Sequence, residues 1–340
     1  MAVSKGQKIT AVDYNELTAD INKIFADNYP DSQPSISAQV LSNQAFGWGN
    51  IPANGAGPGT KITADLVNQI IDRVNISAEH TGSEFELDRV IPRQRITHSI
   101  WNDISTLIQD ITPKKNKADV GKTALTQLGT VAQTIPFNTT LDFNLAFRFG
   151  DYDQARYFFN SSSQLKFYIK QSGGGAEDLE WQTAYDKLST VTLSLNNTVS
   201  TTSNIISEDK GFEDLRADEQ LLLSLTSKTG GGGYGYGYGY GYGSGGNNSY
   251  GYGGYGYGGY GYGAGTTKTI RVYGRIIPTQ GNTYQSGPVD LILRVQLTDS
   301  DEQLTSGTHT VHVQSNKATS KTSGVAAFSI DNPTFTGSST

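Results

Sequence analysis

Residues 289–297 read VDLILRVQL, and this stretch decides the fold class of the chain. Its odd positions, from Val289 to Leu297, are all apolar, whereas charged or polar side chains such as Arg294 stand at most even positions. Successive side chains of a strand point to opposite faces, so this alternation predicts a strand with one buried face. Residues 141–149, LDFNLAFRF, repeat the pattern. We therefore expect an α+β chain that is mainly β.

Shorter strand patterns surround these two stretches. They cover residues 165–169, 191–195, 221–225, 270–273 and 308–313. Several strands at short spacing predict a β-sandwich or jelly-roll-like domain over residues 131–320. Residues 155–160 are interpreted as one more strand, which would form a hairpin with residues 165–169 through the serines 161–163. Residues 179–188 predict a short helix that carries Trp181 and Tyr185.

A Gly-Tyr tract lies between two of the predicted strands. Residues 230–265 read GGGGYGYGYGYGYGSGGNNSYGYGGYGYGGYGYGAG and hold 20 of the 40 glycines and 11 of the 19 tyrosines. Glycine offers nothing to bury and disfavours a helix by about 1 kcal/mol per residue, so the tract predicts neither a core nor a helix. Two forms remain: an extended array with its tyrosines on one face, or a disordered linker.

The sequence around and within the tract favours presentation of its tyrosines at a tip or interface. Strand patterns flank it on both sides, and the turn-rich centre SGGNNS, residues 244–249, separates two Tyr-Gly arms as in an elongated hairpin. The candidate partner-binding residues are therefore the tyrosines of both arms: Tyr234, Tyr236, Tyr238, Tyr240, Tyr242, Tyr250, Tyr252, Tyr255, Tyr257, Tyr260 and Tyr262.

One frame occurs three times in the first 110 residues. Residues 8–22 read KITAVDYNELTADIN, residues 61–75 read KITADLVNQIIDRVN, and residues 95–109 read RITHSIWNDISTLIQ. Each copy predicts a short helix with apolar spacing and a threonine N-cap, at Thr10, Thr63 and Thr97. An asparagine recurs inside each helix, at Asn15, Asn68 and Asn102, which suggests a specific structural hydrogen bond rather than a ligand site.

These patterns divide the chain into four parts. Residues 1–111 form a docking region with three helices, and residues 112–130 form a polar connector. The β-domain spans residues 131–320 and contains the Gly-Tyr tract, and residues 321–340 form a tail. Three short helices bury little apolar surface by themselves, so we expect them to pack together or against neighbouring subunits.

The composition narrows the class of protein. A net charge of −6 and a pI near 5.3 argue against a nucleic-acid scaffold, and with no cysteine there are no disulfides. No stretch approaches the roughly 20 apolar residues of a membrane span, and the first residues lack the apolar core of a signal peptide. We expect a protein that assembles in the host cytoplasm, does not insert into membranes and does not bind nucleic acid.

No residue pattern predicts catalysis, a metal or a cofactor. There is no nucleophile motif, and His309 and His312 are three residues apart on a strand, so they would face opposite sides and share no metal ion. The acidic residues Asp299, Asp301 and Glu302 are interpreted as a solvated turn rather than a calcium site. Asp151 and Asp153 are likewise interpreted as a turn between strands.

Three segments resemble virion proteins of tailed phages. Residues 6–22, GQKITAVDYNELTADIN, resemble N-terminal segments of phage tail, baseplate and fibre proteins, in which short ITAxxxN helices recur. Residues 153–169, DQARYFFNSSSQLKFYI, with the glycine-rich turn and Trp181 that follow, resemble a β-rich module of large tailed phages, cyanophage-like ones included. That module usually carries two glycines where this chain has serines 161–163. The Gly-Tyr tract is similar to the tips of T-even-like phage adhesins, although its strict alternation departs from them.

The resemblance implies a virion protein of the tail or its appendages and brings no catalytic residue with it. The leading hypothesis is a non-enzymatic, homo-oligomeric structural protein, a trimer or a higher ring, that binds other virion proteins through residues 1–110. The tyrosines would then contact host surface glycans or adjacent subunits. The alternatives are a polysaccharide-degrading tail-spike enzyme and a filament or lattice protein unrelated to host binding.

Overall fold

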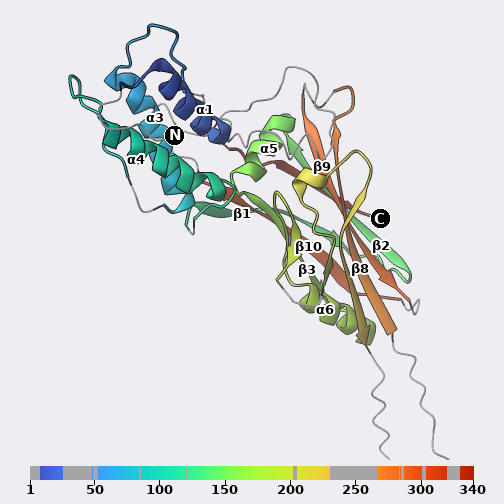
Figure 1. Ribbon diagram of the computed structural model, residues 1–340. Helices are drawn as coiled ribbons and strands as arrows, with labels where there is room; N and C mark the ends of the chain where they lie inside the picture. Colours follow the sequence, from blue (N-terminus) through green and yellow to red (C-terminus); the bar gives the residue numbers. More distant parts are fainter. Residues whose placement is uncertain are drawn as a thin grey trace, which may run out of the picture.

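The computed structural model describes most of the chain outside the Gly-Tyr tract. The described residues are 8–25, 48, 53–83, 86–119, 121–201, 205–229, 266–282, 284, 287–300, 304–319 and 330–340. Within these residues three helices come first, and two antiparallel sheets with 11 strands in total follow (Figure 1). The predicted class, α+β with β predominating, is therefore confirmed. Among the described residues, no helix is long and apolar enough to cross a membrane.

The three predicted helices are present and pack against one another. They are α1 (Ala11–Phe25), α3 (Ala64–Thr81) and α4 (His98–Ile111), followed by the 3₁₀ turn η1 (Thr112–Lys114). We call residues 8–114 the helical region. The predicted caps are confirmed: the Thr63 hydroxyl accepts a hydrogen bond from the Leu66 N–H, and the Thr97 hydroxyl accepts one from the Ile100 N–H. Thr10 and Asp13 form a capping box.

The predicted asparagine hydrogen bonds are confirmed in the first two copies of the frame. Asn15 bonds to the backbone of Ala56, and Asn68 bonds to the backbone of Val90. Apolar side chains on the inner faces of the three helices, Leu17 and Ile104 among them, are 2% exposed or less. The inner faces of the three helices therefore form part of the buried core that continues into the sheets.

Eleven strands form the two sheets. They are β1 (Thr123–Gln133), β2 (Thr140–Phe149), β3 (Gln164–Ser172), β4 (Val191–Leu193), β5 (Thr198–Ser200), β6 (Ile206–Ser207), β7 (Gln220–Thr229), β8 (Thr266–Pro278), β9 (Val289–Asp299), β10 (Thr308–Ala318) and β11 (Thr334–Ser339). One sheet has the order β1-β10-β3-β4-β5 and the other β11-β2-β9-β8-β7-β6. Strand β9 alternates buried and half-buried residues along its whole length, as its sequence predicts.

The two sheets approach closely where β1 lies against β11. A Cβ atom added at Gly129 would lie 2.7 Å from the ring of Phe335, and one added at Gly337 would overlap the side chain of Val131. Glycine has no Cβ, so these two positions let the sheets come together at this edge. The sheets share one buried core, which includes Phe143, Leu145 and Leu293.

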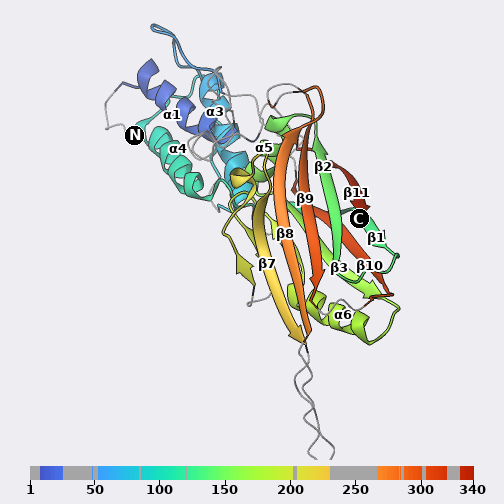
Figure 2. The same cartoon turned by 90° about the vertical axis from the view of Figure 1, so that its right-hand side faces the viewer.

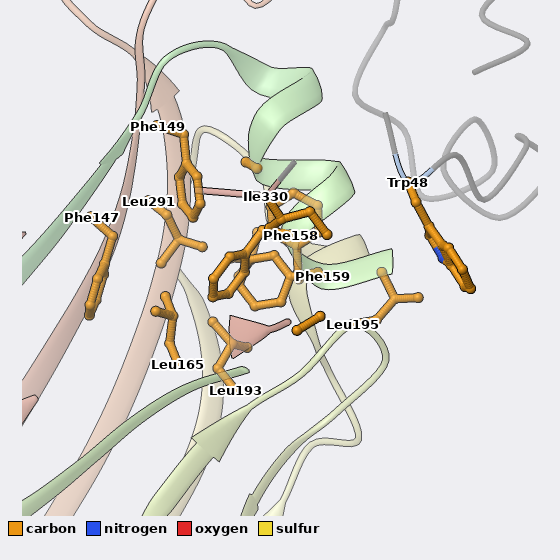
Figure 3. Packing of buried hydrophobic residues seen from close by; sticks show 14 of the residues in the cluster. Trp48, Phe147, Phe149, Phe158, Phe159, Leu165, Leu193, Leu195, Leu291 and Ile330 are labelled. Atoms are coloured by element: carbon orange, nitrogen blue, oxygen red, sulfur yellow. The ribbon is translucent and has the colours of Figure 1, made fainter. Parts of the chain in front are cut away.

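A helix closes each end of the space between the sheets. Helix α5 (Tyr152–Asn160) lies at the end near the helical region, where Phe158 and Phe159 point into the core with Phe149 (Figure 3). The ring centroids of Phe149 and Phe158 are 5.6 Å apart. Helix α6 (Ala176–Leu188) lies at the opposite end, against β3, β7 and β8 (Figure 1). The predicted helix over residues 179–188 is thus confirmed.

The prediction of a strand at residues 155–160 is wrong. These residues belong to α5, which Asp151 caps by accepting a hydrogen bond from the Gln154 N–H at 2.7 Å. Asp151 and Asp153 therefore stand at a helix N-terminus rather than in a turn between strands. Ala155, Phe158 and Phe159 share one helical face, so the apolar spacing is that of a helix, and the serines 161–163 end the helix instead of joining two strands.

Two strands extend the β-domain beyond its predicted bounds. Strand β1 begins at Thr123, inside the predicted connector, and β11 occupies residues 334–339, inside the predicted tail, where it pairs with β2. Both are edge strands in which most side chains are exposed or half-buried, so neither carries an alternating apolar pattern. Because both strands lie at the edge of a sheet, their sequences do not show the alternating pattern that predicts a strand.

The helical region is joined to the sheets through His80. Its Nε2–H donates a hydrogen bond to the Ser161 carbonyl at 3.1 Å, and its ring lies 4.5 Å from that of Trp48. The backbone N–H of Asp119 donates to the His80 carbonyl at 2.8 Å. Burial lowers the pKa of His80 to about 4, so the imidazole is neutral at pH 7.

Candidate functional site

All eleven candidate tyrosines lie outside the described residues, but the structure fixes the point from which the tract leaves. Thr229, the last residue of β7, pairs with Thr266, the first residue of β8, and the two strands are neighbours in the six-stranded sheet. The 36 residues between them therefore leave and re-enter the sheet at one place. That place lies at the end of the molecule opposite α1, α3 and α4 (Figures 1 and 2).

A buried ion pair lies close to this point, two residues into β8. Lys268 faces inward from β8, and its Nζ lies 2.6 Å from Asp299 Oδ2 and 3.5 Å from Glu180 Oε2. The ammonium also lies 5.8 Å from the centroid of the Trp181 ring on α6. A buried charge is tolerated when it is paired, and removing one partner is strongly destabilising. The ion pair therefore ties β8, β9 and α6 together.

The prediction of a solvated acidic turn is wrong for Asp299. Its carboxylate accepts the hydrogen bond from Lys268, and the residue is only 4% exposed. Asp301 and Glu302, the other two members of that prediction, lie outside the described residues. Lys268 itself gave a sequence signal, because it occupies the same face of the strand pattern as Ile270 and Val272, where an apolar residue is expected.

Helix α6 also contacts the other strand at the base of the tract. Ser227 of β7 stands opposite Lys268 in the strand register, and its hydroxyl accepts a hydrogen bond from Lys187 Nζ at 2.9 Å. The end of β9 adds two further bonds, in which Ser300 N–H donates to the Thr267 carbonyl at 3.2 Å and Thr267 N–H donates to the Ser300 hydroxyl at 3.0 Å. Both strands that bear the tract are thus held by side chains and backbone.

The N-terminus of α6 is fixed by a buried aspartate. Asp178, which is 1% exposed, accepts a hydrogen bond from the Gly175 N–H at 2.7 Å through one oxygen. Its other oxygen accepts from the Gly307 N–H at 2.8 Å, just before β10 begins. A carboxylate bonded to backbone N–H groups caps the helix and also joins it to the second sheet.

His309 and Tyr185 extend this polar cluster. The Tyr185 hydroxyl lies 2.6 Å from His309 Nδ1, and His309 Nε2 lies 3.8 Å from Asp178 Oδ1. Burial lowers the pKa of His309 to about 4, and burial together with the Asp178 charge raises the pKa of Tyr185 well above 10. At pH 7 the tyrosine O–H therefore donates to a neutral imidazole, whose remaining N–H lies on the Asp178 side.

The side chains of Asp178, His309 and Tyr185 are buried together in the described part of the chain. An Asp-His-hydroxyl series is the order of groups that activates a nucleophile, but here each of the three residues is at most 2% exposed. None of them lines either of the two open cavities described for this part of the chain, which have volumes of about 340 and 370 Å³.

The prediction that His309 and His312 face opposite sides of a strand is confirmed. His309 points into the core, whereas His312 lies on the opposite face of β10 and stacks on Tyr168 with ring centroids 4.7 Å apart. Within the described ranges, no three His, Cys, Asp or Glu side chains gather in a way that could hold a metal ion. Comparison with known proteins finds no matching family model, no matching curated protein and no matching solved structure.

Proposed function

We propose that this chain is a non-enzymatic structural protein of a phage virion, associated with the tail or its fibres. It binds other virion proteins through its helical region and presents the Gly-Tyr tract to a host surface or to a neighbouring subunit. The observation that carries this proposal is the pairing of Thr229 with Thr266 at the end of the sheet farthest from the helices. Attachment and presentation are thereby assigned to opposite ends of one molecule.

The length and composition of the tract support its role in contact. Two arms of about 18 residues each, extended at about 3.3 Å per residue, would reach roughly 60 Å from the sheet. The eleven tyrosines supply aromatic area and hydroxyl groups, which suit both glycans and protein partners. Glycines between them leave the backbone bare for close approach.

The braces beneath the tract support a mechanical role. Lys268, Asp299 and Ser227 connect both bearing strands to the rest of the molecule. A protein that transmits a load between a particle and an attached surface needs its contact segment fixed to a rigid body.

The virion assignment rests on the three sequence resemblances, and homo-oligomerisation follows from the same class.

We further propose a jelly-roll-like connectivity for the sheets. The chain crosses between the sheets from β1 to β2 and from β9 to β10, as it also does from β2 to β3 and from β5 to β6. The four strands β1, β2, β9 and β10 pair as β1 with β10 and β2 with β9. Such nested pairing is a feature of wound double hairpins.

Replacement of the first five tyrosines of the tract by serine tests the proposal. The changed residues are Tyr234, Tyr236, Tyr238, Tyr240 and Tyr242. Adsorption to host cells and incorporation into particles should be measured separately, because loss of the first indicates host attachment and loss of the second indicates subunit contact. Each tyrosine buried at an interface contributes on the order of 1–2 kcal/mol, so the loss should be evident.

The matched control is a Gly-Ser segment of the same length in place of residues 230–265. If this variant adsorbs and assembles as well as the wild type, the tyrosines have no contact role and the proposal fails. The thermal unfolding midpoint of both variants should stay within a few degrees of the wild type, since the tract lies beyond the last paired residues Thr229 and Thr266.

A further inference from the structure

The strands of the five-stranded sheet β1-β10-β3-β4-β5 contain no aspartate and no glutamate. The whole chain, by contrast, has 32 acidic residues against 26 basic ones and a net charge of −6. We call the side of this sheet that points away from the shared core the outer face. Because no carboxylate stands on its strands, the positive charge that the outer face carries is not neutralised within the sheet.

Two lysines of β3 supply that positive charge. Lys166 and Lys170 point outward, since they alternate with Phe167 and Ile169, whose side chains are buried in the core. Four residues along a strand separate the two lysines by about 13 Å. No ion pair or hydrogen bond joins either ammonium group to another described residue. Both cations are therefore available to an anionic partner.

A stacked pair of rings lies between the two lysines. Tyr168 of β3 stands opposite His312 of β10, and the two ring centroids are 4.7 Å apart. The Lys170 ammonium lies 5.5 Å from the centroid of the Tyr168 ring. Burial and the Lys170 charge both lower the pKa of His312 from its ordinary value of 6.5. On its other side His312 faces Thr130 of β1, which does not titrate.

Uncharged hydrogen-bonding side chains surround the lysines and the ring pair. They occupy the outward positions of β1, β10 and β4, because each lies in register with an outward residue of a neighbouring strand. These residues are Gln127, Thr130, Thr192, Thr310 and Gln314. Amide and hydroxyl groups can donate and accept hydrogen bonds, as the hydroxyls of a sugar also can.

A cavity of about 340 Å³ adjoins the outer face at the start of β3. Its lining includes Gln164 and Ser194, the next outward positions after Lys166 and Thr192. Lys117 also lines it, and no carboxylate does so among the described residues. Asn116 is a further lining residue, and its Oδ1 is buried with no hydrogen-bond partner among the described residues. Such an oxygen needs a donor, which a ligand in the cavity would supply.

We propose that the outer face and this cavity form a binding site for an acidic polysaccharide, one whose sugars carry carboxylate or sulfate groups. Charge complementarity selects an anionic partner, and the lysines bond to its acid groups. The neutral side chains bond to sugar hydroxyls, and the cavity, which has the volume of a ligand pocket, receives one sugar. The site lies on strands other than β7 and β8, so it does not depend on the Gly-Tyr tract.

Nucleic acid suits this surface less well. The strands of the five-stranded sheet contain no arginine, and Tyr168 already stacks on His312. Sites for single-stranded nucleic acid use aromatic rings on which the bases stack, together with a basic groove that follows the backbone. Two lysines and many uncharged hydrogen-bonding groups match a chain of sugars with spaced acid groups better.

Calorimetric titration of the full-length protein tests the proposal. Polygalacturonate carries carboxylates, dextran sulfate carries sulfates, and uncharged dextran is the negative control. We expect binding to at least one acidic polymer and none to dextran. The double variant Lys166→Gln/Lys170→Gln should weaken that binding by about tenfold or more. Lys61→Gln/Lys228→Gln removes the same charge from exposed positions elsewhere and should leave the affinity nearly unchanged. No binding, or equal losses in the two variants, overturns the proposal.

Nuclear magnetic resonance locates the bound polymer. Its acid groups offset the Lys170 charge, so the pKa of His312 should rise when the polymer binds. The His312→Gln variant identifies the signal. Binding that leaves this pKa unchanged overturns the assignment to the outer face.

Two further measurements test the cavity and the class of partner. Asn116→Ala should weaken binding without lowering the thermal unfolding midpoint, because no described residue bonds to its Oδ1. Unchanged affinity removes the cavity from the site. Polyglutamate and single-stranded DNA serve as other polyanions, and we expect both to bind more weakly than the polysaccharide. Tighter binding of either one overturns the polysaccharide assignment in favour of an acidic peptide or a nucleic acid.

Discussion

Lys268 and Asp299 form an ion pair of 2.6 Å in which both side chains are fully buried. The pair lies two residues from the point where β8 receives the chain back from the Gly-Tyr tract, and it joins that strand to the end of β9. A buried charge is strongly destabilising without its partner, so the stability of the sheet depends on this ion pair between β8 and β9.

Removal of the lysine should be costly. We expect Lys268→Ala to lower the free energy of unfolding by about 3–5 kcal/mol, because Asp299 would remain buried without its main partner. Urea unfolding followed by circular dichroism measures the change. Lys228→Ala, at an exposed position of β7, is the control and should change stability by less than about 0.5 kcal/mol. A Lys268→Ala protein as stable as the wild type would contradict this account.

The two hydrogen bonds between Asn68 and the backbone of Val90 should contribute measurably to the stability of the helical region. Asn68→Ala removes two hydrogen bonds and leaves the N–H and C=O of Val90 unpaired, so we expect a loss of about 1–3 kcal/mol. Asp65→Ala, at an exposed position in the first turn of the same helix, should cost less than about 1 kcal/mol. Chemical denaturation measures the free energy of unfolding of both variants. Equal losses would show that the Asn68 hydrogen bonds do not stabilise the helical region.

The close approach of the two sheets can be tested by a glycine-to-alanine substitution, which adds one methyl group between them. Gly337→Ala places a Cβ against the side chain of Val131, and overpacking of this kind typically costs 1–3 kcal/mol, so we expect a loss of about that size. Gly150→Ala is the control, because its new Cβ would meet nothing nearer than 3.9 Å. The added change Val131→Ala should restore part of the loss. Thermal unfolding that shows no such recovery would indicate another cause.

Acid should weaken the contact between the helical region and the sheets. Burial lowers the pKa of His80 to about 4, against about 6.5 in the unfolded chain. Between these values the unfolded state binds more protons, so the contribution of His80 is complete above pH 6.5 and falls by up to about 3 kcal/mol as the pH drops to 4. His309 acts in the same direction, while Asp153, whose pKa burial raises to about 6, acts against both below pH 6.

A His80→Gln variant isolates that contribution. Glutamine does not titrate, so the stability of the variant should fall less steeply between pH 6.5 and 4 than that of the wild type. Denaturant unfolding at several pH values gives the two slopes. Parallel slopes would show that His80 is not the group that titrates.

Local sequence patterns predicted much of the fold. The alternation in residues 141–149 and 289–297 predicted strands β2 and β9, and the threonine caps predicted three helices. By contrast, the aromatic sequence of residues 155–160 predicts a strand, although these residues belong to α5. Its aromatic residues favour strands in general, but the cap from Asp151 and burial between the two sheets outweighed that preference.

Features that depend on neighbours in the chain can be predicted from the sequence: the buried face of each central strand, the start of each helix and the recurring asparagines. Which groups meet depends on the tertiary structure. Lys268 could be recognised as a charge on an apolar face, but its partners Glu180 and Asp299 come from a different helix and a different strand. The edge strands β1 and β11 likewise depend on pairing with β10 and β2. Periodicity records which face of an element is buried, whereas a contact between distant residues exists only once the chain has folded.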